Sequence, residues 1–189
     1  MIPATTKCDQ RHRHQCPLSQ TVNLTFSILE LHSTYGVAEM DETHSYHVTA
    51  KWEAGRNGVV SSKEIHPLIH FSAPPEFKGE CGLWTPEHFL LAAVASCFIV
   101  TFYAMAAASK IEFVSLQLHV QGTLGKVGGK LRFTEIVLQP TLMIAYNDEL
   151  ERAKRVLEKT HEGCMIARSL ACPVLMEPVM RPAEELLAG

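Results

Sequence analysis

The chain of 189 residues is 47% hydrophobic and 20% charged, with a formal net charge of -3 at pH 7. This balance predicts one globular domain that buries a core without disulfides or a metal. Because the net charge is negative and lysine and arginine form no stripe, nucleic acid and anionic membrane surfaces are excluded as default partners, and a small substrate is favoured.

The first 45 residues are polar and irregular, which predicts a poorly ordered extension (1–45) ahead of the domain (46–180) and a C-terminal tail (181–189). Met40 is a candidate native start. Zinc binding by Cys8, His12, His14 and Cys16 is an alternative, but no second ligand pair with zinc-finger spacing follows, so we expect no metal. Irregular cysteine spacing and the lack of a secretory signal favour the cytoplasm.

A three-stranded segment is predicted next. Residues 46–52 alternate apolar and polar side chains, as in a half-buried strand. The sequence Gly55-Arg56-Asn57-Gly58 then predicts a hairpin whose tight turn is Asn57-Gly58, with Arg56 held at the tip. Val59 onward returns as the second strand, and residues 65–71 form the third.

A long helix follows the proline-rich loop of residues 73–79. Thr85 suits the N-cap and Pro86 the first helical position, while Glu87 places negative charge in the first turn. The apolar run of residues 89–108 is long enough to span a membrane. Its many alanines and the lack of a basic flank favour instead a helix buried between protein layers, without a membrane partner.

Residues 116–124 and 131–139 predict a second hairpin that turns at Gly128-Gly129, and Pro140 interrupts it before an edge or continuing strand. A helix capped by Asn147 and ended by Gly163 comes next, and then a short strand within residues 169–177. The order of elements predicts an α+β fold.

Two thiols stand out in this arrangement, because Cys97 lies within the apolar helix and Cys164 directly follows the later one. A thiol peroxidase needs a thiolate, a cation that holds it and a second thiol that condenses with the sulfenic acid. Cys97, Arg56 and Cys164 offer these groups, and Glu87 can orient the guanidinium. The alternatives are that Cys97 only fills the core and that Cys81, on a loop, competes as the second thiol.

Four stretches of sequence resemble one known family, the OsmC/Ohr family of organic hydroperoxide peroxidases, over residues 46–179. They are Gly55-Arg56-Asn57-Gly58, the block Thr85-Pro86-Glu87-His88 leading to Ala95-Ser96-Cys97-Phe98, Arg132-Phe133-Thr134-Glu135-Ile136, and His161-Glu162-Gly163-Cys164. The resemblance implies that Cys97 is the peroxidatic thiol, Cys164 the resolving thiol, and Arg56 with Glu87 a polar clamp.

The resemblance also implies antiparallel sheets wrapped around long central helices in an intertwined homodimer. A dithiol such as protein-bound lipoamide would recycle the disulfide, although Met165-Ile166-Ala167 departs from the usual residues after the resolving cysteine and leaves the reductant open. Glu87 and Cys97 are ten residues apart, which is about 15 Å along a straight helix. Either the helix breaks or Glu87 acts across subunits.

The expected activity is the reduction of organic hydroperoxides to alcohols through a Cys97–Cys164 disulfide cycle, without a cofactor. Phe77, Phe89, Phe98 and Phe102 are expected to line a pocket that favours alkyl or lipid peroxides. Two alternatives remain open: a noncatalytic protein that binds a hydrophobic ligand, and a thiol sensor whose oxidation changes a partner interaction.

Overall fold

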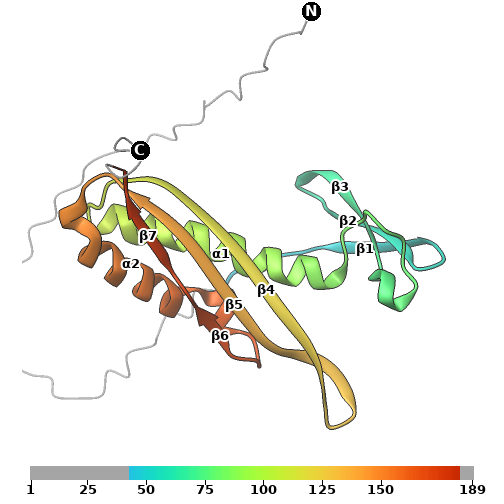
Figure 1. Ribbon diagram of the computed structural model, residues 1–189. Helices are drawn as coiled ribbons and strands as arrows, with labels where there is room; N and C mark the ends of the chain where they lie inside the picture. Colours follow the sequence, from blue (N-terminus) through green and yellow to red (C-terminus); the bar gives the residue numbers. More distant parts are fainter. Residues whose placement is uncertain (1–42, 184–189) are drawn as a thin grey trace, which may run out of the picture. The chain divides into compact units, whose positions relative to one another are not determined.

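The computed structural model describes residues 43–183, and those from Ser45 on belong to one compact unit (Figure 1). The predicted extension therefore lies almost entirely outside the described residues, together with its candidate zinc ligands and Met40. The elements in chain order are β1 (Thr49–Ala54), β2 (Asn57–Ser62), β3 (Ile65–Ser72), the 3-10 turn η1 (Pro75–Phe77), α1 (Pro86–Ala108), β4 (Phe113–Val127), β5 (Lys130–Ile144), the 3-10 turn η2 (Asn147–Glu149), α2 (Leu150–Gly163), α3 (Met165–Arg168), β6 (Val174–Met176) and β7 (Val179–Pro182). The α+β class predicted from the sequence is confirmed.

The first sheet is antiparallel, with the strand order β1-β2-β3. Its first turn is not the predicted Asn57-Gly58, because Ala54 pairs with Asn57 and leaves Gly55 and Arg56 at the tip. Gly55 supplies the positive φ, at 55°. Gly58 has a different role: a Cβ added there would lie 2.6 Å from the Lys51 carbonyl oxygen, so glycine allows close strand pairing.

Strand β1 is exposed along its whole length, although the alternation of residues 46–52 predicts a half-buried strand. The strand also starts later than expected, at Thr49. Alternating side chains require a covering layer on one face, and the described residues supply none for β1.

Helix α1 begins as the sequence predicts, with Thr85 as N-cap and Pro86 in the first turn. The Thr85 hydroxyl accepts a hydrogen bond from the His88 backbone N–H at 3.3 Å, and His88 Nδ1 accepts one from the Thr85 N–H at 3.3 Å. These two bonds form a capping box that uses histidine in the position where glutamate or glutamine is usual. The helix then runs without a break to Ala108.

The chain covers only one face of α1. Its buried residues are Val94, Cys97, Phe98, Phe102 and Ala106. On other faces Val100 is 65% exposed and Tyr103 is 67% exposed. Within residues 43–183, α1 is the one helix long and apolar enough to cross a membrane, and 22% of its most apolar stretch is buried. The sequence predicts that protein layers bury α1, and the described residues of this chain bury one of its faces.

The second sheet is built on the long antiparallel hairpin β4–β5, which runs beside α1 in Figure 1. It turns at Gly128 and Gly129, both with positive φ, as predicted. Strand β5 continues through Pro140, which pairs with Leu118, so the proline does not end the strand. The sequence pattern does not reveal that β6 and β7 pair with β5 in parallel, or that β7 continues to Pro182.

Helix α2 starts later than predicted. Asn147 does not cap it, because residues 147–149 form η2 and α2 begins at Leu150. One face is buried, formed by Ala153, Val156, Leu157 and Thr160. The helix ends at Gly163, as the sequence predicts, and Cys164 joins it to the short α3. Side chains of α1, β5 and α2 together form the hydrophobic core.

Candidate active site

The structure brings two of the four predicted site residues together: the side chains of Cys97 and Cys164 lie close enough for each to shift the pKa of the other. Cys97 lies mid-way along α1, and Cys164 lies between α2 and α3. Both are free and buried, with Cys97 9% exposed and Cys164 0%. Two neighbouring buried thiols are the groups from which a disulfide can form.

Gly163 allows the end of α2 to approach α1 this closely. A Cβ added at Gly163 would lie 3.3 Å from Met105 Cε and 3.6 Å from Thr101 Cγ2, both on α1. The space that a side chain would fill is therefore taken by two methyl groups of the neighbouring helix. Cys164 is carried against α1 as a consequence.

The environment of Cys97 favours its thiolate. Burial by itself raises the pKa of Cys97. Hydrogen bonds from the backbone N–H of Ile166, the Cys164 thiol, the Thr101 hydroxyl and the backbone N–H of Met165 outweigh that effect, so the pKa lies below the ordinary value of a thiol. Cys97 is thus the stronger nucleophile of the pair near neutral pH.

The pKa of Cys164 is shifted in the opposite direction. Burial raises it, and hydrogen bonding to Cys97 together with the negative charge there raises it further. Backbone N–H groups of Ala167 and Ile166 offset part of this increase. Cys97 therefore loses its proton at a lower pH than Cys164 does.

Three contributors to this environment were not singled out from the sequence: Thr101 and the backbone N–H groups of Met165 and Ile166. The position of Thr101, four residues after Cys97 on one helix, is a signal that the sequence contains, because residues at that spacing share a face. The backbone donors belong to α3, whose four residues are too few for a periodic pattern to reveal.

Arg56 does not contact the thiol pair. It is exposed at the β1–β2 turn. Its backbone carbonyl accepts a hydrogen bond from the Ala73 N–H at 3.2 Å. Over residues 43–183, its guanidinium has no ion pair or side-chain hydrogen bond, so the predicted clamp with Glu87 is not formed within this chain.

Glu87 is likewise separate from Cys97. The unbroken helix excludes one of the two explanations for their spacing, the helix break, and leaves about 15 Å of rise between them. Its Oε2 is buried and has no hydrogen-bond partner among residues 43–183. The side chain lines a cavity of about 460 Å³, together with Thr85, His88, Leu91 and Phe133 among others. A buried carboxylate oxygen without a donor is costly, so this position calls for a partner.

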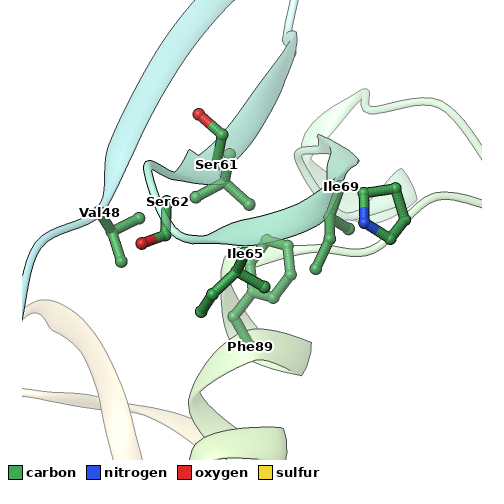
Figure 2. A pocket seen from close by; sticks show the side chains of 8 residues that line it. Val48, Ser61, Ser62, Ile65, Ile69 and Phe89 are labelled. Carbon is green, nitrogen blue, oxygen red and sulfur yellow. The ribbon is translucent and has the colours of Figure 1, made fainter. Parts of the chain in front are cut away.

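An apolar pocket of about 340 Å³ lies between the first sheet and the start of α1 (Figure 2). It is lined by Val48, Val60, Ser61, Ser62, Ile65, Pro67, Ile69 and Phe89. Of the four aromatic residues expected to line a substrate pocket, Phe89 does so here. Phe98 and Phe102 do not, because both are buried in the core, and Phe77 lines neither this pocket nor the cavity beside Glu87.

The remaining described cysteines lie outside the pair. Cys81 is exposed on the loop before α1, and Cys172 is half-buried before β6. In the described part of the chain, no three His, Cys, Asp or Glu side chains gather in a group that could hold a metal ion. The chemistry that this arrangement offers is therefore that of the two thiols.

The α+β fold and the buried pair of thiols place this chain in a class of thiol proteins. Comparisons with known proteins identify the family. Residues 79–178 match the model of the family described as OsmC-like protein, and the chain belongs to this family. It is 27% identical over 130 residues to the uncharacterized protein YmaD of Bacillus subtilis, a match that covers 67% of this chain and 87% of YmaD.

Solved structures show the same fold. An OsmC-like protein of unknown function from Vibrio cholerae is 22% identical with a TM-score of 0.67, covering 72% of this chain and 100% of that one. An organic hydroperoxide resistance protein from Elizabethkingia anophelis is 19% identical with a TM-score of 0.62, covering 76% and 99%. The recognition of the OsmC/Ohr family from the sequence is confirmed.

Proposed function

We propose that this protein is a thiol peroxidase that reduces organic hydroperoxides to alcohols through a disulfide cycle of Cys97 and Cys164. The observation that carries the proposal is the buried pair of free cysteines, Cys97 and Cys164, which interact so that the pKa of Cys97 is lowered and that of Cys164 is raised. Membership of the OsmC-like family and a fold shared with hydroperoxide resistance proteins support a redox role.

The reaction begins when the Cys97 thiolate attacks the distal oxygen of the hydroperoxide. The O–O bond breaks, the alkoxide leaves and takes up a proton as the alcohol, and Cys97 becomes a sulfenic acid. The sulfur of Cys164 then attacks the sulfur of Cys97. The hydroxyl group leaves as water with the Cys164 proton, and a disulfide forms. A dithiol reductant returns both residues to thiols and is itself oxidised to a disulfide.

Arg56 and Glu87 act in this proposal across the interface of a homodimer. Three observations agree with a site completed by a second subunit. Helix α1 is unbroken, Glu87 Oε2 is buried without a partner among the described residues, and the Arg56 guanidinium is exposed. In the dimer, Glu87 orients the guanidinium, which stays charged and stabilises the thiolate and the departing oxygen. The exposed apolar faces of α1 and β1 supply the surface that such a dimer buries.

The proposed substrates are alkyl or lipid hydroperoxides, because six of the eight residues that line the pocket in Figure 2 are apolar, although neither Cys97 nor Cys164 is among them. Reduction of a buried disulfide suits a slender dithiol such as a lipoyl group on a protein. A cycle that must return to thiols also fits a reducing compartment, and we propose the cytoplasm.

The test follows peroxide consumption with cumene hydroperoxide or hydrogen peroxide and with dihydrolipoamide as reductant. We expect the unaltered protein to prefer cumene hydroperoxide, and Cys97→Ser to lower kcat/KM by on the order of a thousandfold or more, because serine offers no thiolate. Cys172→Ser is the matched control and retains activity, since Cys172 lies outside the pair.

Mass spectrometry after one equivalent of cumene hydroperoxide then maps the bridge, which we expect between Cys97 and Cys164. A bridge to Cys81 would overturn the role of Cys164. Binding of the peroxide without consumption, or without oxidation of any thiol, would favour the noncatalytic binding protein. Oxidation that dithiols do not reverse in repeated turnovers would favour the thiol sensor.

A further inference from the structure

The ring of Trp84 packs against the ring of Phe89, which lies five residues later at the start of α1. The two rings are stacked, with their centroids 5.6 Å apart and an interplanar angle of 9°. Phe71 on β3 meets the Phe89 ring edge-on, with centroids 6.2 Å apart and an interplanar angle of 75°. Stacked and edge-on arrangements are both favourable for aromatic pairs. Phe89 is therefore held by two rings that lie outside α1.

Trp84 is itself held in place by its backbone. Its carbonyl accepts a hydrogen bond from the Ser72 N–H at 2.9 Å, and it forms an isolated parallel bridge with Phe71. The next residue, Thr85, is buried and caps α1. The indole also meets the His88 ring edge-on, with centroids 6.1 Å apart. These contacts fix Trp84 to β3 and to the first turn of α1.

Phe89 connects this stack of rings to the apolar pocket. Figure 2 shows its side chain rising from the first turns of α1 toward the strand residues of the pocket. Trp84 is not among the eight described residues that line the pocket, it lies outside the hydrophobic core, and it is 48% exposed. A change at Trp84 therefore reaches the pocket through Phe89 and leaves the core side chains in place.

We propose that Trp84 is a positioning residue that holds the Phe89 ring as a wall of the pocket and so sets how tightly the pocket binds the apolar group of a hydroperoxide. A phenylalanine side chain has several staggered rotamers, and the stack with Trp84 selects one of them. The pocket, at about 340 Å³, has the size of a small-molecule site.

This proposal deepens the peroxidase function proposed above and rests on it for the identity of the ligand. Phe89 is two residues from Glu87, whereas eight residues and about 12 Å of helix rise separate it from Cys97 of the same chain. In the proposed dimer Glu87 acts beside the thiol of the second subunit, so the pocket lies next to that site. The packing of Trp84 on Phe89 does not depend on peroxide turnover.

The experiment measures the binding of cumyl alcohol, the product of cumene hydroperoxide, by nuclear magnetic resonance titration of the full chain. Trp84→Leu removes the stacked ring and is expected to raise the Kd about threefold to tenfold. Trp84→Phe keeps a ring for stacking and should stay within about twofold of the unaltered protein. Tyr146→Leu is the matched control, because it removes an exposed ring elsewhere, and its Kd is unchanged.

A double-mutant cycle shows whether Trp84 acts through Phe89. Phe89→Leu alone is expected to weaken binding, and Trp84→Leu added to it should weaken binding no further, because the ring that Trp84 holds is absent. With cumene hydroperoxide as substrate, Trp84→Leu should raise KM and leave kcat nearly unchanged, since the variant alters the binding of the apolar group and not the thiols.

Fluorescence gives a second readout that needs no change at Trp84. The chain has two tryptophans, so in Trp52→Phe the emission comes from Trp84 alone. It is expected to shift as cumyl alcohol binds against Phe89. Absence of a shift at saturation, an unchanged Kd for Trp84→Leu, or an equal loss in the Phe89→Leu background overturns the role of Trp84.

The two proposals fail in different ways. If the unaltered protein does not bind cumyl alcohol, this inference is overturned, and peroxide consumption alone decides the function. If binding depends on Trp84 as expected but no peroxide is consumed, the peroxidase function is overturned and the role of Trp84 stands in a noncatalytic binding protein.

Discussion

At the scale of single residues, the two thiols differ although both are buried and both are cysteine. The difference comes from the direction of their hydrogen bonds, since Cys97 accepts from four groups and Cys164 donates to Cys97. Each pKa shift therefore depends on the partner residue. The spacing of Cys97 and Cys164 in the sequence does not show which is the nucleophile, whereas their surroundings in the folded chain distinguish them.

Removing either cysteine should move the pKa of the other in opposite directions. Cys164→Ala takes one donor from Cys97 and is expected to raise the pKa of Cys97, so its reactivity falls off at a higher pH than in the unaltered protein. Cys97→Ala removes the neighbouring negative charge and is expected to lower the pKa of Cys164. The pH dependence of alkylation at each peptide checks both, and shifts in the same direction would contradict this account of the pair.

The sequence predicts the chemistry of the pair but not its surroundings. Cys97 and Cys164 are recognisable because a thiol in an apolar helix and one after a helix end are unusual positions. The sequence does not identify Thr101 as a neighbour of Cys97, because a threonine one helical turn away is common. It does not reveal the backbone N–H groups of α3 either, because every residue except proline has one. Arg56 and Glu87 remain predictions, because the described residues of this chain do not bring either side chain to Cys97.

At the scale of elements, capping and turn residues account for the start of each helix and for two places where the sequence prediction was wrong. Thr85 and Pro86 specify the start of α1 because capping depends on neighbours in sequence. The start of α2 was misplaced because Asn147 opens a 3-10 turn first. The β1–β2 turn lies at Gly55-Arg56 and not at the predicted Asn57-Gly58. Either glycine could form a turn, and the packing of Gly58 against Lys51 and Phe71 decides between them.

The capping box gives a prediction for stability. Thr85→Ala removes the acceptor for the His88 N–H and is expected to lower the free energy of unfolding by about 1 kcal/mol. Thr85→Ser keeps the hydroxyl and should lose clearly less. Urea denaturation followed by circular dichroism measures both, and equal losses for alanine and serine would show that the buried methyl group, and not the cap, stabilises this end of α1.

At the scale of the whole molecule, the chain leaves apolar surface that its own described residues do not cover. Val100 and Tyr103 on α1 lie on a face that is apolar and exposed, and strand β1 is exposed throughout. Exposed apolar surface on this scale is typical of interaction sites, which agrees with the proposed dimer. The same surface accounts for the difference from the sequence predictions of a buried central helix and a half-buried strand, because the described residues cover one face of α1 and neither face of β1.

Mixing two inactive variants tests the shared site directly. We expect that Cys97→Ser and Glu87→Ala, each nearly inactive alone, recover activity when their subunits are unfolded and refolded together. A mixed dimer then has one site with Cys97 from one chain and Glu87 from the other, whereas an arrangement within one chain restores nothing. Sedimentation of each variant checks that both are dimers, and a monomeric active protein would exclude the shared site.

The closeness of Cys97 and Cys164 also bears on how well the proposed peroxidase would resist inactivation by peroxide. A sulfenic acid that meets a second peroxide before its partner thiol is converted to sulfinic acid, which simple thiols do not repair. In the proposed cycle the partner is Cys164, which lies close enough to Cys97 in the reduced state to shift its pKa, so we expect the bridge to close quickly. Irreversible inactivation should therefore require peroxide far in excess of what turnover needs.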